Sequence, residues 1–224
     1  MLNRVCASYL VAILVTSYSV AWGQTGGQSF DILIANGKVI NGTGNPWFHA
    51  DIGIRGDMIV EIGDLSGKMA AQTIDAKGLV VSPGFIDVHA HVADSFNSTD
   101  GNAVLNYLIQ GVTTVVSGND GSGTDEIAAT KRKWELGGMG VNAAMLVGFI
   151  DIRREVLGAD YRRLADAGEL AAIKSRIRQA MEEGAWGITT GLEVDRIFYL
   201  PEDGEYNTWI STEELIEVTR VVAD

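Results

Sequence analysis

The stretch PGFIDVHAH, residues 83–91, marks the point at which the hydrophobic pattern of this chain changes its period. Before it, over residues 30–81, short runs of alternating apolar and polar residues are separated by turn signals. The pairs Asn36-Gly37 and Gly56-Asp57 tolerate positive φ angles and favour two-residue hairpin turns. We therefore expect this segment to form a small antiparallel β-module.

After residue 83, four apolar runs alternate with segments of helical pattern. The runs are GFIDVHAH (84–91), VTTVVSG (112–118), VNAAMLVGF (141–149) and AWGITTG (185–191). Strands that are apolar on both faces and alternate with helices indicate a parallel α/β sheet, either doubly wound or part of a (β/α)8 barrel. A complete barrel takes about 250 residues. We therefore predict a partial TIM-like barrel that holds the first four βα units, and interpret the chain as an N-terminal fragment.

Local signals indicate where the intervening helices begin and end. Residues 98–100, Ser-Thr-Asp, offer an N-cap to a helix over AVLNYLIQ, residues 103–110. A charged helix is expected over residues 125–136, and apolar residues recur at helical spacing over residues 168–184. Ser211 and Glu214 form a capping-box pattern ahead of the last helix.

The first 23 residues have the composition of a secretory signal peptide. Arg4 precedes the apolar run YLVAILV (9–15) and the small residues SVAWG (19–23). The alternative is a membrane anchor, but the run is shorter than the roughly 18 apolar residues that a span requires. We predict a signal peptide over 1–23, a β-module over 24–82 and a half-barrel over 83–224. The exported domain would be periplasmic or secreted, with no stable membrane insertion and without Cys6, the only cysteine.

The charge of the chain excludes one class of partner. The formal net charge is −12, and an acidic surface repels phosphate groups, so we expect no nucleic-acid partner. The chain is 46% hydrophobic and 21% charged, which is typical of a folded domain and not of a disordered one.

Two histidines in the first predicted strand are candidates for metal ligands. His89 and His91 are two residues apart, so they project from the same face of a strand. Neutral imidazoles placed in this way can ligate one divalent metal, most naturally Zn²⁺, although a pair of solvent-facing strand histidines has the same spacing. Asp120 and Glu193 follow the second and fourth strands, at the ends where barrel enzymes carry their sites. Each alone is typical of a loop carboxylate, but as a set they favour a metal site.

The order of four motifs resembles a known family. DILIANGKVINGTGNP (31–46), IDAKGLVVSPGFIDVHAH (74–91), GVTTVVSGNDG (111–121) and GITTGLE (187–193) resemble the metal-dependent amidohydrolase superfamily, and within it the D-aminoacylase (N-acyl-D-amino-acid deacylase) branch. The resemblance implies a β-sandwich packed on a TIM barrel that holds one or two zinc ions. It implies that His89 and His91 are ligands, that Glu193 lines or bridges the site, and that the reaction is hydrolysis of the amide C–N bond of a small N-acyl amino acid.

The sequence departs from this branch at several positions. Asp120 stands where the branch typically has a cysteine ligand, and a carboxylate is a harder ligand than a thiolate. Phe149 stands where relatives often have a histidine, and Arg153 nearby is either a partner for a substrate carboxylate or a helix-surface residue. No histidine follows His91. The family takes two further histidines and a catalytic aspartate from later strands, so we expect the general base beyond residue 224 and no activity from this chain alone.

Two other functions remain compatible with these residues. A cyclic amidase of the dihydroorotase or hydantoinase type shares the His-x-His strand. A non-catalytic exported binding domain that retains the fold would also carry these motifs. Metal content and substrate assays distinguish the three.

Overall fold

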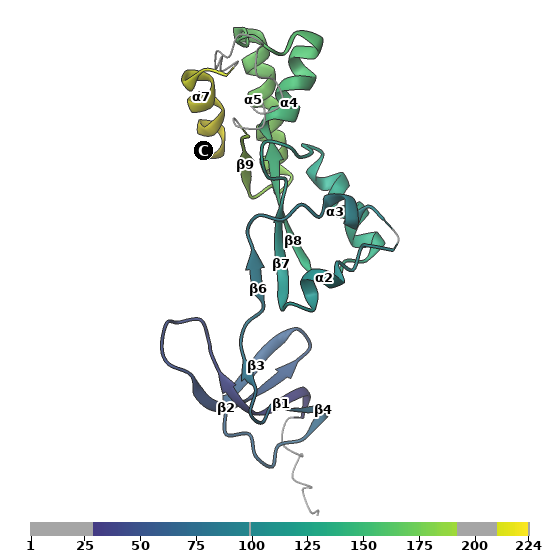
Figure 1. Ribbon diagram of the computed structural model, residues 1–224, viewed down its shortest axis with the longest axis vertical. Helices are drawn as coiled ribbons and strands as arrows, with labels where there is room; N and C mark the ends of the chain where they lie inside the picture. Colours follow the sequence, from purple (N-terminus) through teal and green to yellow (C-terminus); the bar gives the residue numbers. More distant parts are fainter. Residues whose placement is uncertain (1–28, 99, 192–209, 224) are drawn as a thin grey trace, which may run out of the picture. The chain divides into compact units, whose positions relative to one another are not determined.

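The computed structural model describes residues 29–98, 100–191 and 210–223, which divide into two compact units at Pro83/Gly84 (Figure 1). The predicted signal peptide, residues 1–23, and the candidate ligand Glu193 lie outside the described residues. None of the helices in the described part of the chain combines the length and the apolar character that a membrane crossing requires.

The first unit is a five-stranded mixed sheet. Its strands are β1 (Phe30–Val39), β2 (Phe48–Arg55), β3 (Met58–Gly63), β4 (Ala70–Asp75) and β5 (Val80–Val81). The order is β3-β2-β1-β4, and β5 also pairs with β1. The β1–β2 and β2–β3 pairs are antiparallel, but β4 and β5 run parallel to β1, so the prediction of a purely antiparallel module is wrong. Alternation of apolar and polar residues is the same in both kinds of pair, so the sequence pattern cannot distinguish them.

One of the two predicted hairpin turns is present. Arg55 pairs with Met58 across Gly56-Asp57, and Gly56 has φ 59°, which confirms this hairpin. At Asn36-Gly37 the prediction is wrong, because β1 continues through the pair with a bulge and Asn36 has φ 63°.

The bulge in β1 is held by side chains from the neighbouring strands. The Asn36 backbone N–H donates to Asp51 Oδ1 at 2.7 Å, and its side-chain amide donates to Asp75 Oδ1 at 2.9 Å. The positive φ of Asn36 therefore belongs to a β-bulge within β1 and not to a turn that reverses the chain.

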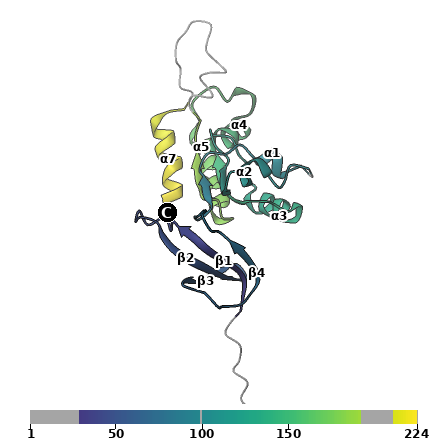
Figure 2. The ribbon, with the colours of Figure 1, turned by 60° about the horizontal axis from the view of Figure 1, so that its bottom comes forward.

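The second unit is built on a four-stranded parallel sheet of order β6-β7-β8-β9. Its strands are β6 (Phe85–Asp87), β7 (Val112–Ser117), β8 (Asn142–Gly148) and β9 (Gly187–Thr189). Its helices are α1 (Ala93–Phe96), α2 (Leu105–Leu108), α3 (Ile127–Gly137), α4 (Phe149–Leu157), the 3-10 turn η1 (Gly158–Asp160), α5 (Ala167–Glu182) and α7 (Thr212–Ala223). Figure 2 shows α5 beside α7, and the two helices are in contact. The parallel α/β prediction is confirmed.

A continuous apolar core holds this sheet against its helices. Val115 of β7, Val147 of β8, Ile173 and Ile177 of α5 and Val218 of α7 are completely buried. Burial of a side chain of this size stabilises the folded state by about 1.5–3 kcal/mol. The core therefore holds the helices against the sheet. The strands are parallel because crossover segments connect them, so their carboxyl ends meet at one edge.

The helix signals have mixed outcomes. The helical spacing over residues 168–184 is confirmed by α5, where Asp166 and Glu169 form a capping box. The N-cap predicted at residues 98–100 is wrong: Ser98 Oγ accepts from the Gly101 N–H at 2.8 Å in a local turn, and α2 begins only after Val104 without a side-chain cap. At α7, Ser211 Oγ accepts from the Glu214 N–H at 3.0 Å, as the capping pattern predicts.

Candidate metal centre

Three side chains converge beyond the carboxyl ends of β6 and β7. The Nε2 atoms of His89 and His91 lie 3.2 Å apart. Asp120 Oδ2 lies 3.4 Å from Nε2 of His89 and 3.2 Å from Nε2 of His91. The three side chains are 56%, 65% and 42% exposed, so a solute can reach them. In the described part of the chain, they form the one group of three or more histidine, cysteine or acidic side chains with ligand atoms this close together.

The spacing of these atoms matches a tetrahedral zinc ion. Zinc binds imidazole nitrogen and carboxylate oxygen at 2.0–2.1 Å, and a tetrahedron with bonds of that length has edges of about 3.3 Å. The three separations, 3.2, 3.4 and 3.2 Å, lie close to that edge length. The two nitrogen atoms and one oxygen atom therefore have the mutual spacing of three corners of such a site.

The histidines reach this position from a bend, and not from within a strand. β6 ends at Asp87, whose carboxylate accepts the His89 backbone N–H at 3.0 Å. The Ala90 N–H donates to the Val116 carbonyl at 3.0 Å, which continues the pairing with β7 beyond the end of the strand. Ala90 is buried, whereas the histidines on either side are exposed. The alternation predicted for a strand persists, and the two imidazoles lie together.

Asn119 is a residue of this centre that the sequence patterns did not single out. It is 7% exposed, and its side-chain amide donates to the carbonyl of Ala90 at 3.3 Å and to the carbonyl of Val116 at 3.0 Å. The amide ties the segment between the two histidines to the end of β7. The sequence did carry a signal for this role, because Asn119 is a polar residue that follows the predicted strand 112–118 and precedes the candidate ligand Asp120.

The Asp120 loop has an unusual backbone conformation. Asp120 has φ 58°, between Gly118 at 93° and Gly121 at 78°. Aspartate tolerates the left-handed region better than most residues because its short polar side chain bonds locally. The Gly121 carbonyl accepts from the N–H groups of Ile150 and Asp151 at 3.0 and 3.3 Å, so the loop is anchored on the first turn of α4.

Arg153, the predicted substrate-binding residue, is buried in α4. Its side chain is 2% exposed, and its Nε donates to Glu214 Oε1 of α7 at 2.7 Å. Its Nη1 donates to the Tyr161 carbonyl at 2.5 Å, and its Nη2 donates to the Arg163 carbonyl. Arg153 therefore joins α4 to α7, and this geometry gives no support to its predicted contact with a substrate. Phe149, at the start of α4, is likewise completely buried.

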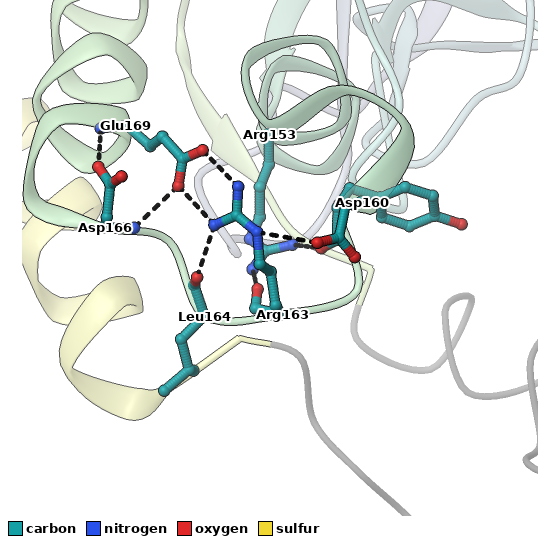
Figure 3. A network of polar contacts seen from close by, with 7 residues as sticks. Arg153, Asp160, Arg163, Leu164, Asp166 and Glu169 are labelled. Atoms are coloured by element: carbon teal, nitrogen blue, oxygen red, sulfur yellow. Dashed lines mark hydrogen bonds and ion pairs between the residues drawn. The ribbon is translucent and has the colours of Figure 1, made fainter.

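An ion-pair network next to Arg153 fixes the start of α5 (Figure 3). Both Glu169 oxygens accept from Arg163, at 2.7 and 2.6 Å, and Glu169 also accepts the Asp166 N–H at 2.9 Å. The hydrogen bonds from Arg163, followed by the one from Asp166, lower the pKa of Glu169 to about 2. The network is part of the helix start and contributes no atom to the group formed by His89, His91 and Asp120.

Comparison with known proteins identifies the class to which this fold and site belong. Residues 72–208 match the amidohydrolase family, and the chain is a member of that family. This match confirms the resemblance to the amidohydrolases that the sequence motifs indicated. The structure agrees with it, because two histidines and a carboxylate lie beyond the strands of a parallel half-barrel.

Within the family, several of the similar proteins are D-aminoacylases or N-acyl-D-amino-acid deacylases. The chain is 37% identical to a D-aminoacylase of Alcaligenes xylosoxydans xylosoxydans, over 88% of this chain and 43% of that protein. It matches a solved D-aminoacylase with a binuclear metal centre at a TM-score of 0.74 and 35% identity, over 86% of this chain and 43% of that one. It matches N-acyl-D-glutamate deacylase of Bordetella bronchiseptica, solved with zinc and a phosphonate inhibitor, at a TM-score of 0.75 and 29% identity, over 88% and 43%.

These matches confirm the fold prediction. The chain spans less than half the length of the relatives it matches, and its parallel sheet corresponds to part of a TIM-barrel amidohydrolase. A β-sandwich module was predicted ahead of the barrel. In the described residues this module consists of one mixed sheet, formed by β1 to β5.

Proposed function

We propose that the protein to which this chain belongs is a metal-dependent hydrolase that removes the acyl group from a small N-acyl-D-amino acid. The observation that carries the proposal is the convergence of His89, His91 and Asp120 with the edge lengths of a tetrahedral metal site. The similarity to D-aminoacylase and to N-acyl-D-glutamate deacylase supports the choice of reaction and substrate class.

The donor set fits one Zn²⁺ ion held by the two imidazoles and the carboxylate. When bound, the ion would lower the pKa of a water ligand and polarise the amide carbonyl. We propose Glu193, outside the described residues, as a further carboxylate, which would allow one or two ions. Among the described residues, we assign no proton acceptor.

The roles of this chain's own residues follow from their contacts. Asp120 supplies the one negative charge among the three donors, which partly neutralises a divalent cation. Asp87 holds the His89 backbone N–H, and Asn119 holds the Ala90 carbonyl, so the histidine segment is fixed from both sides. Such outer contacts orient the ligands, and losing one typically costs 10–100-fold in metal affinity.

The test is hydrolysis by the full gene product, purified with and without zinc. N-acyl-D-amino acids, N-acyl-L-amino acids and cyclic ureides are assayed in parallel, and zinc content is measured by mass spectrometry. We expect zinc-dependent turnover of the D substrates, which is lost together with the metal in His89→Asn and His91→Asn. We also expect the 224-residue chain to bind metal without turnover.

The assay also decides between the alternatives. Preferential turnover of cyclic ureides would replace the proposal by a cyclic amidase. A protein with neither bound metal nor turnover would be a non-catalytic binding domain.

We also propose that the protein is exported, on the pattern of residues 1–23. Cell fractionation and N-terminal sequencing of the mature protein test this. A mature protein that begins at Met1 in the cytoplasmic fraction would contradict export.

A further inference from the structure

We propose that Gly191 is a positioning residue of the metal centre. The absence of a side chain at this residue lets the Asp120 loop rest on the segment that follows β9, and this contact places the Asp120 carboxylate next to both imidazoles. The inference rests on the proposed metal site and adds a residue that is not itself a ligand.

The contact between the two segments is backbone on backbone. A Cβ atom at Gly191 would lie 2.0 Å from the carbonyl oxygen of Asp120 and 2.5 Å from its carbonyl carbon. The backbone of Gly191 is not in the left-handed region. Glycine is therefore required at this position because a Cβ atom would clash with Asp120, and not because the backbone has a positive φ angle.

The next residue of the loop, Gly121, is also tightly packed, against Ile150 of α4 and against Gly191. A Cβ atom at Gly121 would lie 2.4 Å from Cγ1 of Ile150 and 2.7 Å from the backbone nitrogen of Gly191. The Gly121 N–H also donates to Thr189 Oγ1 of β9 at 3.4 Å. Asp120 and Gly121 are thus held between the first turn of α4 and the end of β9, with little room to move.

A side chain at residue 191 would displace the ligand by more than a metal site tolerates. Carbon and oxygen atoms in contact need about 3.3 Å. An alanine at 191 would therefore push the Asp120 carbonyl by about 1 Å. Ligand distances in a metal site are usable within about 0.2 Å of their ideal values. The carboxylate would leave its position at 3.4 and 3.2 Å from the imidazoles.

Gly187 of β9 provides a matched control. A Cβ atom there would meet only Cδ2 of Leu146, at 3.5 Å, which is an ordinary contact. Like Gly191, it does not have a positive φ angle. Gly187→Ala and Gly191→Ala therefore make the same chemical change near the same strand, and only the second meets the Asp120 loop.

The experiment measures Zn²⁺ affinity of the purified chain by competition with a chromophoric chelator. We expect Gly191→Ala to weaken binding by about 10–100-fold, as loss of an outer support does, and Gly187→Ala to change it by less than about twofold. The measurement is repeated with Asp120→Asn in the background. If Gly191 acts through the Asp120 carboxylate, Gly191→Ala has no further effect there. An equal loss in both backgrounds, or wild-type affinity in Gly191→Ala, overturns the inference.

Two further measurements cover the remaining outcomes. If the unaltered chain binds no zinc, the proposed metal site fails, and crystal structures of the metal-free variants decide the inference instead. We expect Asp120 Oδ2 to move about 1 Å from the imidazoles in Gly191→Ala and to stay in place in Gly187→Ala. A carboxylate that stays in place in both variants overturns the inference.

If Gly191→Ala does not fold, Thr189→Val removes the Gly121 hydrogen bond from the same contact. It should weaken zinc binding by about two- to tenfold, the range of one hydrogen bond, and unchanged binding overturns the inference.

Discussion

Asp120 combines two properties that usually belong to different residues. Its carboxylate lies within 3.4 Å of two imidazoles, and its backbone has φ 58°. Asparagine shares the tolerance for this conformation, but its amide oxygen carries no charge. A change to asparagine therefore separates the charge of the ligand from the shape of the loop.

We predict that Asp120→Asn lowers Zn²⁺ affinity by about 100-fold. Loss of a residue that only supports a ligand costs about 10–100-fold, and the loss of a charged ligand should reach the upper end of that range. The midpoint of thermal unfolding in the metal-free state should stay within a few degrees of that of the unaltered chain. Isothermal titration and calorimetric melting check the two values. A matched Asp94→Asn variant, at an exposed helix residue outside the group, should bind zinc normally. Wild-type affinity in Asp120→Asn would remove this residue from the centre.

The oxygen ligand also sets the expected choice of metal. A carboxylate is harder than a thiolate, and softer metals prefer sulfur. We predict that Asp120→Cys raises the ratio of Cd²⁺ to Zn²⁺ affinity by at least about tenfold relative to the unaltered chain. Titration with each metal under reducing conditions measures the ratio. An unchanged ratio would show that residue 120 does not bind the ion.

Among the elements, α4 and α7 are joined by a buried ion pair. Arg153 and Glu214 have side-chain exposures of 2% and 5%, whereas the adjacent Arg154 is 34% exposed and meets Asp151 at 3.8 Å. Removal of one partner of a buried pair leaves an uncompensated charge in the interior, while an exposed pair contributes little.

We predict that Arg153→Met lowers the free energy of unfolding by about 3–5 kcal/mol, and that Arg154→Met lowers it by at most about 1 kcal/mol. The double change Arg153→Met with Glu214→Met should be less destabilising than Arg153→Met alone, because no buried charge remains unpaired. Urea unfolding followed by circular dichroism measures all three. Equal effects of the two single changes would mean that Arg153 does not join the helices.

The start of α5 makes stability depend on pH. Hydrogen bonds from Arg163 lower the pKa of Glu169 from 4.5 to about 2 in the folded chain. Since the folded pKa is the lower one, this stabilisation is fully present above pH 4.5 and is lost as the pH falls through about 2. We predict that Glu169→Gln lowers the melting temperature near pH 6 and that the difference from the unaltered chain shrinks toward pH 2. A difference that stays constant across a pH series would contradict the pairing.

Over the whole molecule, the two units have separate apolar cores. Phe30, Leu33 and Leu65 form the core of the mixed sheet, and Leu65 is 1% exposed. Replacing a buried leucine by alanine costs about 2–5 kcal/mol. We predict that Leu65→Ala reduces hydrogen-exchange protection in β1 to β4 and leaves protection in α5 unchanged. Ile59→Ala, at a residue that is 58% exposed, is the control and should change little. Equal loss of protection in α5 would mean that the units unfold together.

The sequence by itself was sufficient for the repeating features of this chain. Four apolar runs predicted four parallel strands, Gly56-Asp57 predicted a hairpin, and the helical spacing after residue 168 predicted α5. The alternation around Ala90 also predicted that two imidazoles lie together. These features depend on the periodicity of apolar residues or on the residues of a short turn. Both are determined by residues that are close together in the sequence.

The tertiary structure decided the features that depend on distant residues. Asn36 forms a bulge because Asp51 and Asp75 arrive beside it on other strands, and Arg153 is buried because α7 brings Glu214 to it. Asp120 meets the imidazoles only because β6 and β7 are neighbours and the backbone at Gly191 leaves room for its loop. Contacts of this kind depend on how the core packs, and local periodicity carries no information about which distant backbones approach each other.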